Sequence, residues 1–309
     1  MKKILIIGGD GYIGSRLCQD FSNKFEVTSL DTCWFSTPSG KTEVGDLRDY
    51  DEGFYRIFDC IILLAGHSSV NMCEGQIESA FKNNVENFLY LISKIEKGQK
   101  FIYASSSSVY GNSGSKHVDE NYTDFIPHNH YDITKHVIDL YAPKFDIEYY
   151  GLRFGTVNGF SPKMRSDVMI NSMVYNGKTN GEIKLFIKDV MRPILGISDL
   201  SLAIEKIIQS EKDKRGIYNL ASFNKTSGEI ANKIKNHLGF PITDLGDNVK
   251  SITNPKLQTK SYNFSIDSTK FKNEFSFEFQ DSVESISEEI IVNFDSIIFS
   301  NRSDVKEYK

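Results

Sequence analysis

The chain is poor in the features that mark secreted, metal-binding and membrane-embedded proteins. Its four cysteines (Cys18, Cys33, Cys60 and Cys73) show neither paired nor metal-type spacing, so we expect a reducing, cytoplasmic setting and no metal site. No apolar run approaches the about 20 residues of a membrane span. The apolar run after the first three residues is too short for a signal-peptide core, so neither a signal peptide nor a membrane partner is expected.

Basic clusters, repeats and low-complexity segments are also missing. The chain carries 36 basic and 41 acidic residues, a net charge of −5, with no basic patch, so nucleic acid is not an expected partner. Its 309 residues suffice for one large domain or for a domain with a lobe packed on it. No linker separates a tethered module.

Short apolar runs alternate with amphipathic stretches in the first half of the chain. This pattern is typical of a parallel α/β sheet with helices on both faces. After Gly159 the pattern becomes mixed, as expected for a smaller C-terminal α/β lobe. The predicted strands are Ile4–Ile7, Phe25–Leu30, Cys60–Ala65, Lys100–Ser105, Ile147–Phe154 and Gly216–Leu220, and the predicted helices include Ser15–Phe21, Gln76–Lys97, Asn129–Lys144, Leu200–Gln209, Glu229–Leu238 and Ser282–Phe299.

Three glycines follow the first strand at a spacing suited to a dinucleotide. Gly8, Gly11 and Gly14 lie between Ile4–Ile7 and the helical stretch Ser15–Phe21. Glycines in such a turn let the backbone approach a pyrophosphate, which sits on the N-terminus of the helix. The spacing is G-x-x-G-x-x-G rather than the commoner G-x-G-x-x-G, and an ordinary strand-to-helix turn is the alternative.

An acidic residue ends the second predicted strand. Asp31 comes about 20 residues after the glycines, where a carboxylate suits the adenosine ribose hydroxyls of NAD. Neither Thr32 nor Cys33 is a cation that could receive a 2′-phosphate, so NAD is favoured over NADP. The simpler alternative for Asp31 is a turn residue at a strand end.

Tyr131 and Lys135 lie four residues apart and therefore share one face of the predicted helix. A lysine cation beside a phenol favours the phenolate, which lowers the tyrosine pKa and makes it a usable base near neutral pH. The pattern is common by itself, so its meaning depends on the motifs that precede it.

Four further motifs follow one another in an order that is typical of one protein family. They are Gly45-Asp46-Leu47, Leu63 to Gly66, Ser105 to Gly111 and Tyr131-x-x-x-Lys135. With the glycine loop they resemble the extended short-chain dehydrogenase/reductase superfamily. More narrowly, they resemble its NAD-dependent nucleotide-sugar epimerase/dehydratase family, of which UDP-galactose 4-epimerase is the familiar member. The resemblance covers Lys3 to about Ile291 and implies a Rossmann-type doubly wound sheet. It places residues 1–160 and 196–221 in an NAD-binding domain, the rest of residues 161–299 mainly in a nucleotide-sugar-binding lobe and residues 300–309 in a flexible tail.

The resemblance also implies roles for single residues. Ser106 takes the catalytic Ser/Thr position, Tyr131 is the base, and Lys135 tunes it and holds the nicotinamide ribose. Further implied NAD contacts are Gly8, Gly11, Tyr12, Ile13, Gly14, Asp31, Asp46, Leu47, Leu64, Ala65, Gly66 and Asn84. Implied nucleotide-sugar contacts are Ser69, Ser106, Ser107, Thr156, Arg165, Asn171, Arg192 and Lys260.

Three of these implied substrate positions carry a reservation. Lys260 stands where the family often has an arginine, which would keep the charge but lose the bidentate geometry. Arg165 and Arg192 could instead be solvated surface charges. For His67 the sequence leaves two roles equally open, a plain loop residue and a sugar contact.

The implied reaction begins when Tyr131 removes a proton from a sugar hydroxyl held by Ser106, while NAD takes a hydride and a 4-keto sugar forms. Dehydratases and decarboxylases of the family usually carry a Glu before Val-Tyr-Gly, where this chain has Ser107 and Ser108. Both reactions are therefore disfavoured. A 4-epimerase is favoured, a 4-dehydrogenase or 4-reductase is the alternative, and a non-catalytic NAD-binding module is a third.

The helix predicted over Gln76–Lys97 is apolar on more than one side, beside the helix that carries Tyr131. This resembles the dimer interface of the family, so a homodimer is expected.

Overall fold

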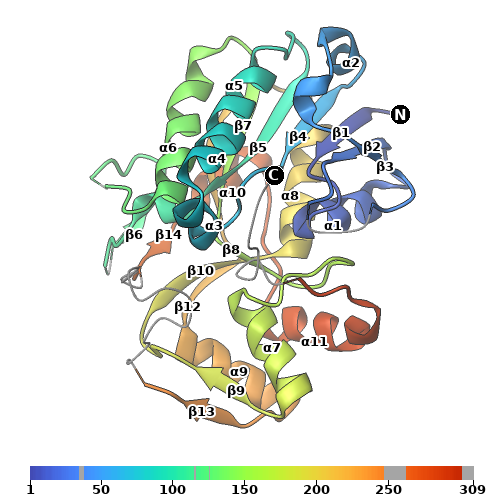
Figure 1. Cartoon of the computed structure of the whole chain (residues 1–309). Coiled ribbons are helices and arrows are strands. Elements are labelled where there is room, and N and C mark those ends of the chain that lie inside the picture. The colour runs from blue at the N-terminus through green and yellow to red at the C-terminus, as the bar shows by residue number, and fades with distance from the viewer. Residues whose placement is uncertain (35–37, 115, 125, 247–261, 301–309) are drawn as a thin grey trace.

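The computed structural model describes residues 1–34, 38–114, 116–124, 126–246 and 262–300. These residues form a domain built on a parallel sheet and a smaller lobe beside the carboxyl ends of its strands (Figure 1). Within these ranges no helix has the length and apolar character needed to cross a membrane.

Seven parallel strands form the central sheet in the order β3-β2-β1-β4-β5-β7-β11, which confirms the predicted Rossmann-type fold. The order reverses between β1 and β4, the point at which such sheets bind ligands at the carboxyl ends of their strands. The strands are β1 (Lys3–Ile7), β2 (Glu26–Asp31), β3 (Thr42–Val44), β4 (Cys60–Leu63), β5 (Lys100–Ser106), β7 (Glu148–Phe154) and β11 (Gly216–Leu220).

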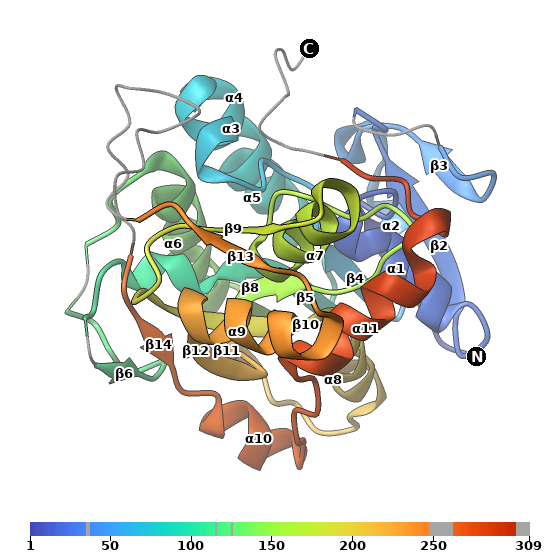
Figure 2. The ribbon, with the colours of Figure 1, turned by 90° about the horizontal axis from the view of Figure 1, so that it is seen from below.

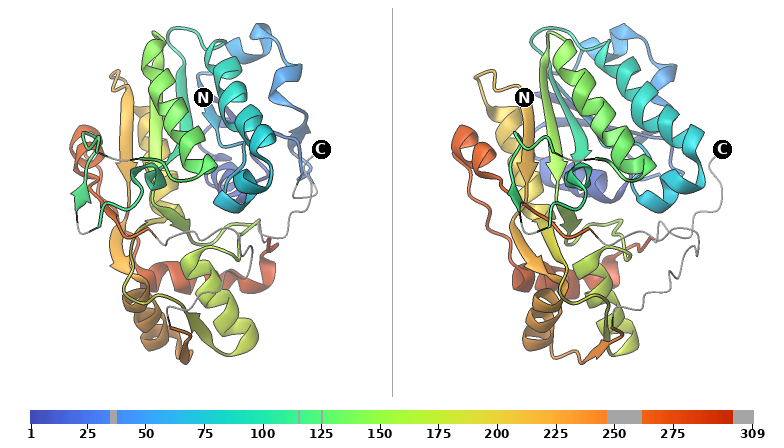
Figure 3. Two further views of the ribbon diagram at one scale, coloured as in Figure 1. Left: turned by 60° about the vertical axis from the view of Figure 1, so that its left-hand side comes forward. Right: turned by 90° about the vertical axis from the view of Figure 1, so that its left-hand side faces the viewer.

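Helices cover both faces of the sheet because its strands are apolar on both sides. In β1, Ile4 and Ile6 belong to one core and Leu5 and Ile7 to the other. Figure 3 shows the sheet between these two layers. The first core includes α1 (Tyr12–Phe21), α8 (Ile197–Gln209) and α10 (Thr269–Phe275), and the second includes α2 (Glu52–Arg56), α5 (Asn87–Ile92) and α6 (His130–Tyr141).

The helix predicted over Gln76–Lys97 is present from Ile77 to Ile92, so it ends earlier than predicted, and it contains a π-helical turn that was not predicted. α4 ends at Phe81, a π-helical turn spans Lys82–Glu86, and α5 ends at Ile92. The π turn contains Asn84, whose side chain is bonded to a neighbouring loop and to α6. Single π turns inside helices are frequent at functional sites, and a hydrophobic period alone does not reveal them. The remaining helices on this side are α3 (Val70–Gly75) and α4 (Ile77–Phe81).

The lobe has its own apolar core, to which three helices and β9 contribute (Figure 2). Its helices are α7 (Met169–Asn180), α9 (Ser227–Leu238) and α11 (Val283–Asn293). A capping box of Thr226 and Glu229 begins α9, and Gly239 ends it in the left-handed conformation. The strands outside the central sheet are β8 (Thr156–Asn158), β10 (Met191–Gly196) and β12 (Phe223–Thr226) in one sheet, and the pairs β9 (Ile183–Leu185) with β13 (Ile242–Asp244) and β6 (His117–Val118) with β14 (Ser265–Ile266).

The chain between β8 and α7 is fastened to the first turns of α1. The Tyr12 hydroxyl donates to the Gly159 carbonyl at 2.9 Å, and Arg16 donates to the Phe160 carbonyl at 2.8 Å. The hydroxyl oxygens of Ser15 and Ser161 lie 2.8 Å apart. The helix that follows the glycine loop therefore fixes the position of the lobe.

Candidate functional site

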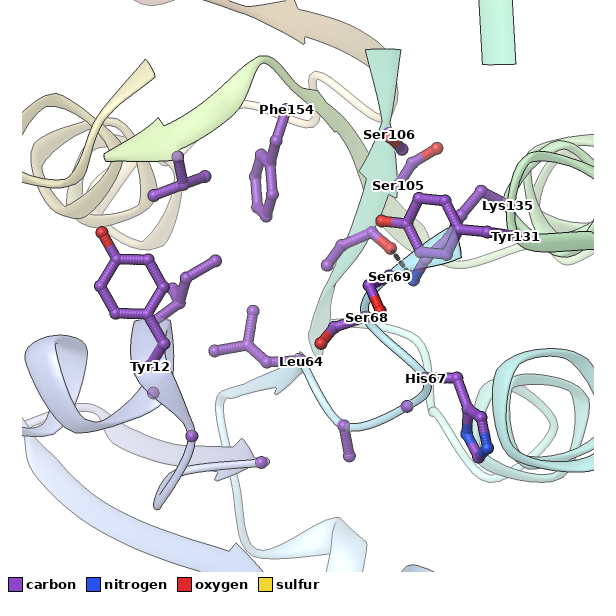
Figure 4. Close-up of a pocket in the computed structure, with 18 of the residues that line it drawn as sticks. Tyr12, Leu64, His67, Ser68, Ser69, Ser105, Ser106, Tyr131, Lys135 and Phe154 are labelled. Carbon is purple, nitrogen blue, oxygen red and sulfur yellow. Dashed lines mark hydrogen bonds between the residues drawn. The ribbon is translucent and has the colours of Figure 1, made fainter. Parts of the chain in front are cut away.

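One cavity of about 460 Å³ lies between the carboxyl ends of the sheet strands and the lobe. Figure 4 shows Tyr12, Leu64 and Phe154 on one side of it and Ser106, Tyr131 and Lys135 on the other. The predicted residues that line it are Gly8, Gly11, Tyr12, Ile13, Gly14, Asp31, Asp46, Leu47, Leu64, Ala65, Gly66, Ser69, Ser106, Ser107, Tyr131, Lys135, Thr156, Arg165 and Arg192.

The glycine loop forms a close cradle at the N-terminus of α1. Gly8 has a φ of +91°, which a side chain would disfavour. A Cβ added to Gly14 would lie 2.1 Å from the Gly8 carbonyl oxygen, so this turn excludes any side chain at Gly14. Backbone N–H groups at a helix N-terminus bind a pyrophosphate, and the loop therefore fits that part of NAD.

Asp31 is oriented by two backbone donors at the end of β2. Its carboxylate accepts from the N–H of Asp10 at 3.0 Å and from the N–H of Cys33 at 2.7 Å. Burial raises its pKa, and these backbone bonds act against that rise. Each carboxylate oxygen can accept a further bond, so the side chain can still receive ribose hydroxyls.

Asp46 and Leu47 also line the cavity, after strand β3. Arg48 donates two hydrogen bonds to the Asp46 carboxylate, at 3.1 and 3.0 Å, and lowers its pKa. Asp46 also caps the short 3₁₀ turn that begins at Leu47. These contacts set the two residues at the cavity wall, where an adenine edge could meet them.

The three predicted catalytic residues lie together on one side of the cavity. Ser106 ends β5, and Tyr131 and Lys135 lie in the first half of α6, which begins after the capping residue Asn129. The Lys135 ammonium donates to the Ala104 carbonyl at 2.7 Å and lies 5.8 Å from the centre of the Tyr131 ring. The backbone of β5 thus holds the lysine beside the tyrosine.

Burial changes the pKa of both side chains in the direction that disfavours charge. Desolvation raises the pKa of Tyr131 to about 12, although a hydrogen bond with Ser106 acts against the rise. Desolvation lowers the pKa of Lys135 to about 8. The expected lowering of the tyrosine pKa is therefore not found in the protein alone, because the loss of solvent outweighs the nearby cation.

Two predicted contact residues, Asn84 and Asn171, lie behind the wall of the cavity and use their amides within the protein. Asn84 accepts from the His67 N–H at 2.7 Å and donates to the Thr134 hydroxyl at 3.0 Å. Asn171 accepts from the Gly159 N–H at 2.8 Å. Both side chains therefore hold neighbouring loops in place, and neither lines the cavity.

The substrate side of the cavity holds two arginines. Arg165 makes a bidentate pair with Asp167, at 2.9 and 2.7 Å, and also donates to the Ser68 carbonyl at 3.2 Å. Burial lowers the pKa of Arg192 to about 10. Ser69 caps α3 by accepting from the Met72 N–H. Lys260 lies outside the described residues.

His67 lines the cavity, but its ring is fully buried and burial lowers its pKa to about 4. Figure 4 shows the ring directed away from Tyr131 and Ser106. This orientation supports the plain loop role that the sequence left open.

Several lining residues were not predicted. Trp34 lies three residues after Asp31 at the same edge of the sheet, and this proximity was a usable signal. Tyr262 and Phe264 reach the cavity from a segment far along the chain, and the predicted contact Lys260, just before them in the sequence, was the usable signal. The other unpredicted lining residues include Thr32, Val70, Asn83, Asn87, Ser108, Phe154, Val157 and Val168.

Known proteins share parts of this sequence. The chain is 31% identical over 163 residues to UDP-glucose 4-epimerase of Rhizobium leguminosarum bv. trifolii, which covers 48% of this chain and 49% of that protein. The chain thus spans about half the length of that relative. It is 25% identical over 258 residues to ADP-L-glycero-D-manno-heptose-6-epimerase of Brachyspira hyodysenteriae, covering 75% of this chain and 80% of that protein.

Solved structures share the whole fold. UDP-glucuronic acid 4-epimerase from Bacillus cereus, in complex with UDP-glucuronic acid and NAD, matches with a TM-score of 0.78 at 21% identity. The match covers 93% of this chain and 97% of that one, and it supports the fold described above.

A family profile matches residues 4–221, which is more than half of the chain. The description of that profile is the NAD dependent epimerase/dehydratase family, in agreement with the resemblance and the NAD cofactor predicted from the motifs. The chain belongs to the NAD-dependent epimerase/dehydratase family.

Proposed function

We propose that the protein is an NAD-dependent nucleotide-sugar 4-epimerase that acts through a transient 4-keto sugar. The observation that carries the proposal is the meeting of Ser106, Tyr131 and Lys135 with the glycine loop and Asp31 in one cavity. A base and a cofactor site that share one cavity can remove a proton and a hydride from the same carbinol.

The residues present fit NAD. Gly8, Gly11 and Gly14 would hold the pyrophosphate, Asp31 the adenosine ribose, and Lys135 the nicotinamide ribose. When bound, NAD supplies a hydride acceptor and a positively charged ring. Lys163, which the structure brings near Asp31 from the lobe, is paired with Asp10 at 2.7 Å, and this pairing supports NAD over NADP.

Tyr131 is the base in this proposal. Its phenolate takes the proton of the sugar hydroxyl that Ser106 holds, and the same phenol returns the proton after the sugar has presented its other face. Because desolvation raises the pKa of Tyr131, the phenolate needs positive charge nearby, which Lys135 supplies in part.

The end of β5 argues for epimerisation over elimination. Ser107 and Ser108 line the cavity where family dehydratases carry an acid, and a hydroxyl is a poor general acid. A 4-keto sugar formed here is therefore reduced by the returning hydride rather than consumed by elimination.

We further propose that the lobe binds the nucleotide. Thr156, Arg165 and Arg192 line its side of the cavity, and arginine suits a diphosphate. Relatives and structural neighbours are named for UDP-glucose and UDP-glucuronic acid, so UDP-sugars are the first substrates to test.

The test is to incubate the NAD-loaded protein with UDP-, GDP- and CDP-sugars and to follow inversion at C4. An inverted product without net NADH supports the epimerase. Accumulated NADH with a released ketone would instead identify the alternative, a 4-dehydrogenase or, in reverse, a 4-reductase. A protein that binds NAD but turns over none of these sugars would favour the third candidate, a binding module.

We also propose a cytoplasmic homodimer. Apolar side chains are exposed on α4 and α6, which pack beside each other. These side chains are Ile77, Phe81, Ile133, Leu140 and Tyr141.

A further inference from the structure

A line of hydrogen-bonding groups leads from Tyr131 to a buried carboxylate. Ser106 bonds to Tyr131, and the hydroxyl oxygens of Ser106 and Ser108 lie 2.8 Å apart. The Ser108 hydroxyl oxygen lies 2.5 Å from Oδ1 of Asp132. The Asp132 side chain is fully buried. Four groups are thus joined in series by three contacts.

Asp132 follows Tyr131 directly in the chain but does not share its surroundings. One residue turns a helix by about 100°, so Asp132 projects from a different face of α6. Its Oδ2 accepts from the Asn129 side chain at 2.7 Å and from the Tyr262 hydroxyl at 2.8 Å. Position 108 has a serine where family dehydratases carry an acid, but the Asp132 carboxylate is hydrogen-bonded directly to this serine.

Each serine hydroxyl has a single proton, so the direction of every bond in the series depends on the others. When Asp132 is ionised, Ser108 must donate to it, and Ser106 must then donate to Ser108. Ser106 can then only accept from Tyr131, which must be a neutral phenol. When Tyr131 is a phenolate, Ser106 donates to it, Ser108 donates to Ser106, and Asp132 must hold the proton.

We propose that Asp132 is a positioning residue that sets the charge state of Tyr131 by exchanging one proton with it through Ser106 and Ser108. Three protons each move across one hydrogen bond: from Tyr131 to Ser106, from Ser106 to Ser108, and from Ser108 to Asp132. A phenol and a carboxylate become a phenolate and a carboxylic acid, with no net change in charge. The proposal rests on the proposed role of Tyr131 as the base.

Burial is consistent with this exchange, because it raises the pKa of Asp132 toward that of a phenol while Ser108, Tyr262 and Asn129 act against the rise. Other titratable or charged groups lie around Tyr131 and Asp132. They are His128 in the segment before α6, Cys73 and Glu74 on α3, Tyr262 beside β14, Arg165 in the lobe and Lys135 on α6.

The test follows Tyr131 itself and needs no sugar. Protein labelled with ¹³C at the tyrosine Cζ and aspartate Cγ is titrated with NAD present, and Tyr131→Phe and Asp132→Asn assign the two resonances. We expect the Tyr131 resonance to move toward phenolate in two steps, the first coinciding with the ionisation of Asp132. A through-space effect would act the other way, because an ionised Asp132 raises the pKa of Tyr131.

Ser108→Ala is the decisive variant, since it keeps the Asp132 charge and removes the connecting hydroxyl. We expect the first Tyr131 step to disappear while Asp132 still ionises. Tyr262→Phe is the matched control: it removes a bond that lowers the Asp132 pKa, so the first step should move to higher pH but persist. A single Tyr131 step in the wild type, or a first step that survives in Ser108→Ala, would overturn the proposal.

Turnover of UDP-glucose and UDP-glucuronic acid supplies a second readout. The wild-type rate should be independent of pH across the neutral range, because the phenolate fraction of a singly ionised pair does not depend on pH. In Ser108→Ala and Asp132→Asn the rate should rise in proportion to hydroxide. If the wild type turns over neither sugar but shows two Tyr131 steps, the proton exchange is supported and the epimerase function is not. If it turns over a sugar but shows a single Tyr131 step, the epimerase function is supported and the proton exchange is overturned.

Discussion

Lys163 of the lobe and Asp10 of the glycine loop form an ion pair with an Nζ to Oδ1 distance of 2.7 Å. The side chains are 12% and 2% exposed, respectively. Burial acts to raise the pKa of Asp10, but the lysine and a backbone N–H outweigh it, so the pKa is lowered. The pair joins the loop proposed for the pyrophosphate to the lobe proposed for the sugar nucleotide.

Lys163→Met should lower the free energy of unfolding by about 3–5 kcal/mol, since it leaves the buried Asp10 carboxylate without this cation. Urea unfolding measures the change. The control is Lys24→Met, which removes the exposed pair with Glu205 and should cost about 0–1 kcal/mol. Equal losses in the two variants would contradict a special role for the buried pair.

The same pair should make stability depend on acid pH. Because the Asp10 pKa is lowered in the folded state, its contribution is present above the ordinary value of 3.8 and is lost as the pH falls through the folded value. Urea unfolding at a series of acid pH values should show a steeper loss in the wild type than in the double variant Asp10→Asn, Lys163→Met. Parallel curves would show that Asp10 is not responsible.

Gly14→Ala should abolish or strongly weaken NAD binding. The added Cβ would meet the Gly8 carbonyl oxygen at 2.1 Å, so the turn that forms the cradle must move. Calorimetric titration with NAD measures the effect. Gly40→Ala is the matched control, because a Cβ there meets no atom within 4 Å. NAD affinity that is equal in both variants would argue against the cradle.

Tyr131→Phe should reduce the rate of sugar turnover by about 10²- to 10⁴-fold, the usual contribution of a general base. NAD binding should persist, because the ring remains and only the hydroxyl is lost. Initial rates and calorimetry measure the two effects. Tyr175→Phe on α7, outside the cavity lining, is the control. Unchanged turnover in Tyr131→Phe would remove Tyr131 from the mechanism.

Leu140→Glu should convert a dimer into a monomer if α4 and α6 form the interface. Leu140 is 57% exposed on α6, and a charge there would be buried at cost between two copies. Light scattering after size exclusion measures the mass. Val292→Glu places a charge at another exposed apolar position, on α11, and should leave the dimer intact. A monomeric wild type at micromolar concentration would contradict the interface.

Local patterns carried much of the prediction. The glycine loop, Asp31 and the segment from Tyr131 to Lys135 are short motifs whose spacing follows from the geometry of a strand, a turn or a helix. The strand from Gly216 to Leu220 was predicted with the bounds that the structure has. The helix predicted over Gln76–Lys97 is present, but its π turn at Asn84 was not predicted, because this turn accompanies tertiary contacts that a periodic pattern does not contain.

By itself, the sequence determined the family, the parallel sheet, and Ser106, Tyr131 and Lys135 as candidates for the chemistry, because each depends on residues close together in the chain. Only the tertiary structure decided how these residues are surrounded. It desolvated Tyr131, so the pKa of Tyr131 moves opposite to the direction that the spacing implied, and it buried Lys135, which lowers the pKa of the lysine. It also brought Ser108 to Asp132 and Lys163 to Asp10, pairs separated by 24 and 153 positions, whose meeting no local pattern records.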